Sequence, residues 1–155
     1  MDELRIPKHE VQVELTLESG EVRGVTVFLA DAASDHTGAE RLVDLLNGAA
    51  DFIPVRSVDA PGVLLMSRAG IVSARAPAES AADVEEWEAV FHHTVEVTLR
   101  GGVTVRGALE YSQAPEHARV LDYLARSEHF FSIHQKEHVV LVNKHHVVHV
   151  VPIDG

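Results

Sequence analysis

Apolar and polar residues alternate along two separate stretches of the chain, residues 11–17 and 95–99. Alternation with a period of two is typical of a strand that buries one of its faces. Each stretch is followed by a turn that contains glycine and then by a second apolar stretch, at residues 22–29 and 103–111. The sequence therefore predicts two β-hairpins, one early and one late in the chain.

Both predicted return strands contain an interior glycine, Gly24 in the first hairpin and Gly107 in the second. A glycine inside a strand indicates a sharp bend or a bulge. We therefore expect each short sheet to curl, as it does in a small barrel.

The spacing of apolar residues then changes from two to three and four, within residues 37–48 and 114–127. That spacing predicts a short amphipathic helix in each segment. A third strand is predicted at residues 52–55 and again at 130–133. Two further short strands follow each of them, separated by the sequences "SRAG" and "NKHH".

Three blocks of the chain occur twice in the same order. Residues 13–24 align with 95–107, residues 39–55 with 117–133, and residues 63–75 with 139–151. An internal repeat of this kind predicts that one structural unit was duplicated. We expect a first unit at residues 1–76, a helical connector at 77–91 and a second unit at 92–155.

The connector is acidic, and Val84, Trp87 and Val90 would share one side of a helix. Each unit alone has roughly 65 residues, a size that is marginal for independent stability. We therefore expect the two units to bury surface against each other. The last strand, near residues 147–153, is apolar on both faces, and we expect it to be buried in that contact.

Composition narrows the class of protein. The chain has 155 residues, of which 46% are hydrophobic and 24% charged, and its net charge is −11. Such a charge repels phosphate backbones, so nucleic-acid binding is disfavoured. No cysteine is present, which excludes disulfides and thiolate zinc sites. The charged N-terminus does not read as a signal peptide and no apolar run is long enough to span a membrane, so we expect a cytoplasmic protein.

The segments "VEVTLRGGVTVRGAL" and "VVLVNKHHVVHVV", with "LLMSRAGIVSAR" in the first unit, resemble the two motifs of the Sm-like small β-barrel family. The pattern covers most of the chain, which is also similar to small bacterial domains of unknown function. The resemblance implies a mainly β (α+β) fold: two tandem Sm-like or SH3-like small barrels, each with an inserted short helix, packed as an internal pseudo-dimer. It also implies barrels that pair edge to edge. The loop that carries the RNA-binding Asp and Asn in that family is replaced here by the short helix.

The two predicted helices repeat one charged pair, Arg41 with Asp44 and Arg119 with Asp122. Residues three apart on a helix are neighbours and can form an ion pair. A duplicated binding or catalytic pair is one interpretation. A structural ion pair or a capping aspartate is the favoured one, since no catalytic motif accompanies the pairs.

Six of the eleven histidines lie within residues 129–150, which raises the question of a metal site. His134, His138 and His146 are the candidates for a zinc or nickel site, which needs three or four ligands at one point. The aligned blocks of the first unit lack these histidines, so the fold itself does not require them. Surface imidazoles are the favoured interpretation, and a metal site is the alternative.

The function that these patterns favour is non-enzymatic. We expect a protein-interaction or scaffold module, without a cofactor, that binds a protein partner or associates with itself through barrel edges. The alternative is an Sm-like nucleic-acid binder. Its predicted contacts are the basic residues Arg56, Arg68, Lys136 and Lys144.

Overall fold

The computed structural model describes residues 8–30, 40–78, 91–111, 120–126 and 129–153. We call residues 8–78 the N-terminal half and residues 91–153 the C-terminal half. The elements of the N-terminal half are β1 (Lys8–Leu17), β2 (Val22–Ala30), α1 (Leu42–Leu46), β3 (Phe52–Ser57), β4 (Val63–Ser67), the 3-10 turn η2 (Arg68–Gly70) and β5 (Ile71–Pro77). Those of the C-terminal half are β6 (Phe91–Leu99), β7 (Thr104–Tyr111), α2 (Val120–Arg126), β8 (Phe130–His134), β9 (His138–Asn143), the 3-10 turn η5 (Lys144–His146) and β10 (Val147–Pro152).

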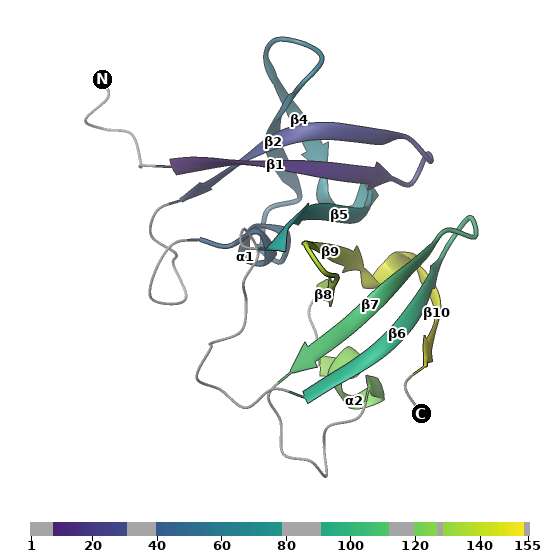
Figure 1. Ribbon diagram of the computed structural model, residues 1–155. Coiled ribbons are helices and arrows are strands. Elements are labelled where there is room, and N and C mark those ends of the chain that lie inside the picture. Colours follow the sequence, from purple (N-terminus) through teal and green to yellow (C-terminus); the bar gives the residue numbers. More distant parts are fainter. Residues whose placement is uncertain (1–7, 31–39, 79–90, 112–119, 127–128, 154–155) are drawn as a thin grey trace.

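The ten strands form one antiparallel sheet in the order β10-β6-β7-β8-β9-β5-β1-β2-β3-β4. Within each half the order is the same, since the last strand of the half pairs with its first strand, followed by the second, third and fourth. The halves meet where β9 lies beside β5 (Figure 1). The mainly β class predicted from the sequence is confirmed.

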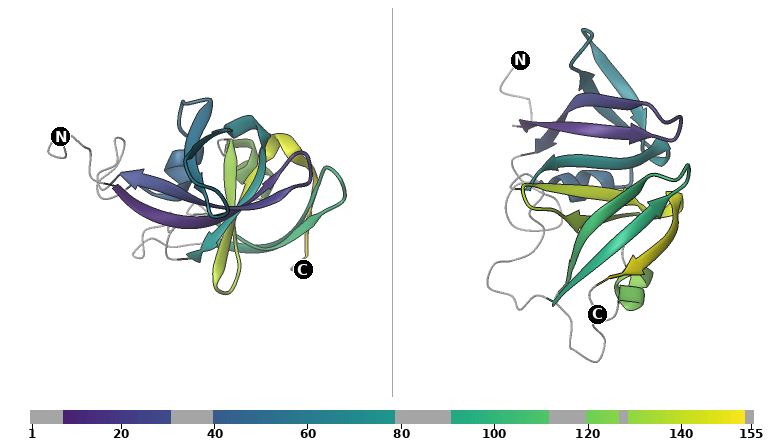
Figure 2. Two further views of the ribbon diagram at one scale, coloured as in Figure 1. Left: turned by 90° about the horizontal axis from the view of Figure 1, so that it is seen from above. Right: turned by 45° about the vertical axis from the view of Figure 1, so that its right-hand side comes forward.

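The sheet is open, which differs from the predicted pair of barrels. Closing the N-terminal half would require β4 to pair with the outer side of β5, but that side pairs with β9. Closing the C-terminal half would likewise require β9 to pair with β10, but β9 pairs with β5. Figure 2 shows the result in its right-hand view, with the N-terminal half above and the C-terminal half below. The strands β4 and β10 therefore lie at the two ends of one continuous sheet.

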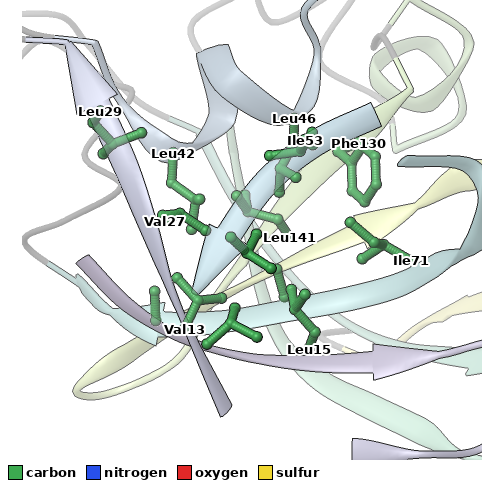
Figure 3. Close-up of a cluster of buried hydrophobic side chains, with 14 of the residues drawn as sticks. Val13, Leu15, Val27, Leu29, Leu42, Leu46, Ile53, Ile71, Phe130 and Leu141 are labelled. Atoms are coloured by element: carbon green, nitrogen blue, oxygen red, sulfur yellow. The ribbon is translucent and has the colours of Figure 1, made fainter. Parts of the chain in front are cut away.

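Two hydrophobic cores lie on this sheet. One is built mainly from the N-terminal half and includes Leu42 and Leu46 of α1, and the other mainly from the C-terminal half. The strand β9 serves both, because Val139 and Leu141 face the first core while Val140 and Val142 face the second. Phe130 of β8 also enters the first core, beside Ile71 and Leu141 (Figure 3). The halves thus complete each other's cores, which agrees with the expectation that they bury surface together.

The expectation for the last strand is wrong. In β10, Val148 is 58% exposed and Val151 is 44% exposed. Strands with both faces buried include β8 and β9, because they lie in the middle of the sheet whereas β10 ends it. An apolar sequence alone does not distinguish a central strand from an uncovered edge.

The glycine pair behaves differently in the two halves. At Gly107 an added Cβ would lie 2.6 Å from the carbonyl oxygen of His134 and 2.6 Å from Cγ2 of Ile133. At Gly24 the nearest atom would be Cγ2 of Val58, at 3.4 Å. Only Gly107 is therefore required for the close approach of a neighbouring strand.

The short helices form where the spacing of apolar residues predicts them, as α1 and α2. Neither is long and apolar enough to cross a membrane, within the residues described. The predicted connector helix falls mostly on residues 79–90, which lie outside the described residues.

Candidate functional site

The contact between the halves is centred on the pairing of β5 with β9. Five residue pairs are in register, from Ser73 opposite Val142 to Pro77 opposite His138. The ladder is extended by the amide of Ala78, which donates to the carbonyl oxygen of Glu137 at 3.1 Å. We call this strand pair, with the side chains that cross it, the junction.

Three polar side chains cross the junction and bind backbone groups of the other half. Asn47 donates to the carbonyl oxygen of Phe130 at 3.1 Å and accepts from the Phe130 amide at 2.7 Å. Asn143 donates to the carbonyl oxygen of Ile71 at 3.0 Å. The Nε2 of His146 lies 3.0 Å from the carbonyl oxygen of Ala69, so this ring nitrogen is the donor. These contacts fix the register of the junction, because each binds one particular backbone group.

The two ends of the sheet carry most of the exposed large hydrophobic side chains. Among the described residues there are eleven, and five lie on the β3–β4 hairpin: Phe52, Val58, Val63, Leu64 and Leu65. Three more, Val148, Val151 and Ile153, lie on β10 or directly after it. An edge strand presents backbone groups with which another chain can pair, and a contiguous apolar patch on it can mark an interaction surface. We call the outer sides of β4 and β10 the open edges.

The open edge of β10 has a defined set of free backbone groups. The amide of Ile153 points inward, since it donates to the carbonyl oxygen of Thr94 at 2.9 Å. Successive residues of a strand direct their backbone groups to opposite sides. Pro152 and Val150 therefore point outward. Proline has no amide hydrogen, so this edge lacks a donor at Pro152.

The first predicted charged pair caps a helix. The amide of Arg41 donates to Oδ2 of Asp44 at 2.8 Å, and the Arg41 guanidinium binds both carboxylate oxygens at 3.2 Å. Asp44 stands in the first turn of α1, where a negative charge stabilises the helix dipole. This geometry fits the structural interpretation. In the second pair, Arg119 and the side chain of Asp122 lie outside the described residues.

The three candidate metal ligands each have a separate partner. His134 Nε2 lies 4.0 Å from Oε1 of Glu110, His138 Nδ1 accepts from Arg75 at 3.3 Å, and His146 binds Ala69 across the junction. No group of three or more His, Asp or Glu side chains placed to hold a metal is found among the described residues. The structure does not bring the predicted ligand set together.

The four predicted nucleic-acid contacts have different surroundings. Arg56 pairs with Glu10 at 2.8 Å and lies over the ring of Phe28. Lys144 donates to the carbonyl oxygen of Leu124 at 2.6 Å. Lys136 is exposed in the turn between β8 and β9. Arg68, in the turn after β4, lines a pocket at the junction.

The asparagines of the junction were missed in the sequence. Asn47 aligns with Ala125 and Asn143 aligns with Ser67, so neither amide is repeated. A position where two aligned copies differ by a polar side chain was the available signal. It could not be interpreted without knowing which strands meet.

Comparison with family models, curated proteins and solved structures gave no significant match.

Proposed function

We propose that this chain is a protein-interaction module that assembles with further copies of itself, β4 of one copy pairing with β10 of the next. One observation carries the proposal. The two uncovered apolar strands are those that align in sequence with the strands paired at the junction, since β4 aligns with β9 and β10 with β5. A contact between copies would thus repeat, between chains, the pairing that already joins the two halves.

The alignment also supplies a register for this contact. At the junction Ala74 is opposite Leu141 and Arg75 is opposite Val140. The aligned pairs at the open edges are Val150 opposite Leu65 and Val151 opposite Leu64. Because Val150 points its backbone groups outward, Val151 and Leu64 form a non-hydrogen-bonded pair, in which side chains lie closest.

The contact between copies is weaker than the junction. Ala125 replaces Asn47, Ser67 replaces Asn143 and Gly70 replaces His146 at the aligned positions, so the polar contacts that cross the junction are not reproduced. Pro152 removes one further donor, and two copies of net charge −11 repel each other. We therefore expect reversible, concentration-dependent association.

The proposal includes a duplicated Sm-like unit as the origin of the two halves. The identical strand order of the halves and the aligned sequence blocks support it. A contact in which different surfaces of two copies meet is heterologous, and it closes into a ring or continues as an open chain. A molecule with this arrangement is suited to act as a scaffold.

The test is sedimentation velocity of the full chain over a wide range of concentration. Leu64→Lys and Val151→Lys should each weaken association at least about tenfold, because a lysine on an edge strand opposes pairing. Val22→Lys is the matched control, since Val22 is similarly exposed but lies on neither open edge. Monomers at every concentration, or an equal loss in all three variants, would reject the proposal.

The register can be tested separately by cross-linking, because the chain has no cysteine of its own. A mixture of Leu64→Cys and Val151→Cys chains should form a mixed disulfide under mild oxidation. Val148→Cys is the control, as it stands within the register shift between Val147 and His149 and outside the regular pairing. Pro152→Ala, which restores the donor, should tighten association severalfold. Equal yields from Val148→Cys and Val151→Cys would contradict this register.

A further inference from the structure

A pocket of about 310 Å³ lies where the ends of β3 and β4 meet the ends of β8 and β9. Both halves contribute to its wall, and several of the lining residues occupy aligned positions. Asp51 aligns with His129, Phe52 with Phe130, and Ala69 with His145. This volume is at the lower end of the range of small-molecule sites. The pocket is formed within one chain, so its role does not depend on pairing between copies.

Arg68 lines this pocket, and one nitrogen of its guanidinium lacks a partner. Its Nη1 atom is buried and makes no hydrogen bond, and no other buried side-chain nitrogen or oxygen of the described residues is left so. A buried polar group without a partner is destabilising, by more when it is charged. Such a group in a native protein calls for an explanation, of which a bound ion is one.

The aligned residue of the C-terminal half shows that this position can be satisfied. Lys144 donates to the carbonyl oxygen of Leu124 at the end of α2. The Arg68 side chain makes no equivalent contact with α1. The backbone contacts of the two turns do correspond: the Arg68 amide donates to the carbonyl oxygen of Asp51, and the Lys144 amide donates to the carbonyl oxygen of His129, both at 2.9 Å. The backbone is the same in the two turns, and only the side chain of Arg68 is left for another partner.

Carboxylates are abundant in this chain, and Arg23, Arg41 and Arg56 each pair with one. Arg68 does not, even though Asp51 lines the same pocket. The chain has almost twice as many acidic as basic residues. A partly buried arginine without a carboxylate partner, such as Arg68, is therefore unusual in it.

Two imidazoles lie at the same pocket. The rings of His129 and His145 have centroids 5.9 Å apart, and both side chains are exposed. The loop that carries His145 is held in place by Asn143, whose Oδ1 accepts from the His145 amide at 3.0 Å. Each imidazole can donate a hydrogen bond to an oxyanion.

We propose that this pocket binds a phosphorylated small molecule. The Arg68 guanidinium offers a planar pair of donors that matches the spacing of two phosphoryl oxygens, and the two histidines offer further donors. The ring of Phe52, which is 58% exposed and lines the pocket, supplies an apolar face for the rest of the ligand. Asp51 is the one acidic group among the described residues of the pocket wall. Its negative charge repels anions, so only an anion that also fits the hydrogen-bond donors of the pocket is expected to bind.

The experiment is an NMR titration of the ¹⁵N-labelled full chain with inorganic phosphate and with phenyl phosphate, at constant ionic strength set with chloride. We expect saturable shifts at amides of residues 51–52, 67–69, 129–130 and 143–145, with phenyl phosphate binding more tightly than phosphate. Arg68→Gln should weaken binding at least about tenfold, the effect of losing a charged pair of hydrogen bonds. Arg68→Lys, which keeps the charge without the planar fork, should give an intermediate affinity.

Arg56→Gln is the matched control, because Arg56 has the same charge but already pairs with Glu10. It should leave phosphate binding unchanged. Three results would overturn the proposal: no saturable shift, equal losses in Arg56→Gln and Arg68→Gln, or shifts spread over the basic residues of the whole surface. The first would indicate that water alone solvates Arg68.

Discussion

At the scale of single residues, the two halves differ at aligned positions. Gly24 and Gly107 occupy aligned positions, but only Gly107 lies against a neighbouring backbone. In the same way, the residues aligned with Asn47 and Asn143 have no side-chain amide, whereas the side chains of both asparagines cross the junction. Single residues therefore give each half its own role within a shared strand order.

The glycine pair allows a direct test of this difference. Gly107→Ala should lower the free energy of unfolding by about 1–3 kcal/mol, because the new methyl group would overlap a carbonyl oxygen that cannot move freely. Gly24→Ala should change it by less than about 1 kcal/mol, since its methyl group would make an ordinary contact. Urea denaturation of both variants measures the difference. Equal destabilisation of the two variants would contradict the close approach of Gly107 to the backbone of His134.

At the scale of secondary-structure elements, the environment of each strand depends on its place in the sheet more than on its own sequence. The strands β9 and β10 are both rich in valine, yet β9 is buried on both faces and β10 is exposed. Directly after α1, the side-chain amide of Asn47 binds the Phe130 backbone of β8. The junction is thus held by a helix end as well as by a strand ladder.

Removing that helix contact should weaken the junction. Asn47→Ala should lower the free energy of unfolding by about 1–3 kcal/mol, because it leaves the amide and carbonyl of Phe130 without their side-chain partner. Asn47→Asp should also be destabilising, since its carboxylate still accepts from the Phe130 amide but places a second oxygen against the Phe130 carbonyl oxygen. Gln12→Ala removes an exposed amide from β1 and serves as the control, with little change expected. Thermal and urea unfolding give the comparison, and an Asn47→Ala variant as stable as Gln12→Ala would contradict it.

At the scale of the whole molecule, charge opposes the proposed assembly while the apolar open edges favour it. The net charge of −11 produces repulsion between copies, and salt screens such repulsion. Binding of this acidic chain to nucleic acid would have the opposite dependence, since it would require counterion release at local basic groups.

Salt therefore distinguishes self-association from nucleic-acid binding. Raising the salt concentration from about 0.1 M to 1 M shortens the Debye length from about 10 Å to about 3 Å. Self-association through the open edges should become severalfold tighter over this range, as measured by sedimentation. A single-stranded RNA titrated in parallel should show no binding at the lower salt. Association that weakens with salt would indicate an ionic contact in place of the apolar edges.

Much of the local structure could be predicted from the sequence. The alternation at residues 11–17 and 95–99 predicted β1 and β6, and the change of spacing predicted α1 and α2. The charged pair of Arg41 and Asp44 was favoured as structural, and the two residues form a capping box at the start of α1. These predictions succeed because the period of apolar residues follows the local geometry of strand or helix.

The pairing of distant strands could not be predicted in this way. Nothing in residues 71–77 indicates that β5 binds β9, and an open sheet and two closed barrels use the same apolar strands. The gathering of Arg68, His129 and His145 at one pocket depends on that same pairing.

The sequence by itself determined the mainly β class, the order of the elements and the correspondence between the halves, because hydrophobic periodicity and aligned blocks are local properties of the chain. Only the tertiary structure decided which edges pair and which stay open. The physical reason is that backbone hydrogen bonds are alike in every strand. The choice of partner therefore depends on the side chains that meet across the contact, and these are brought together only when the chain is folded.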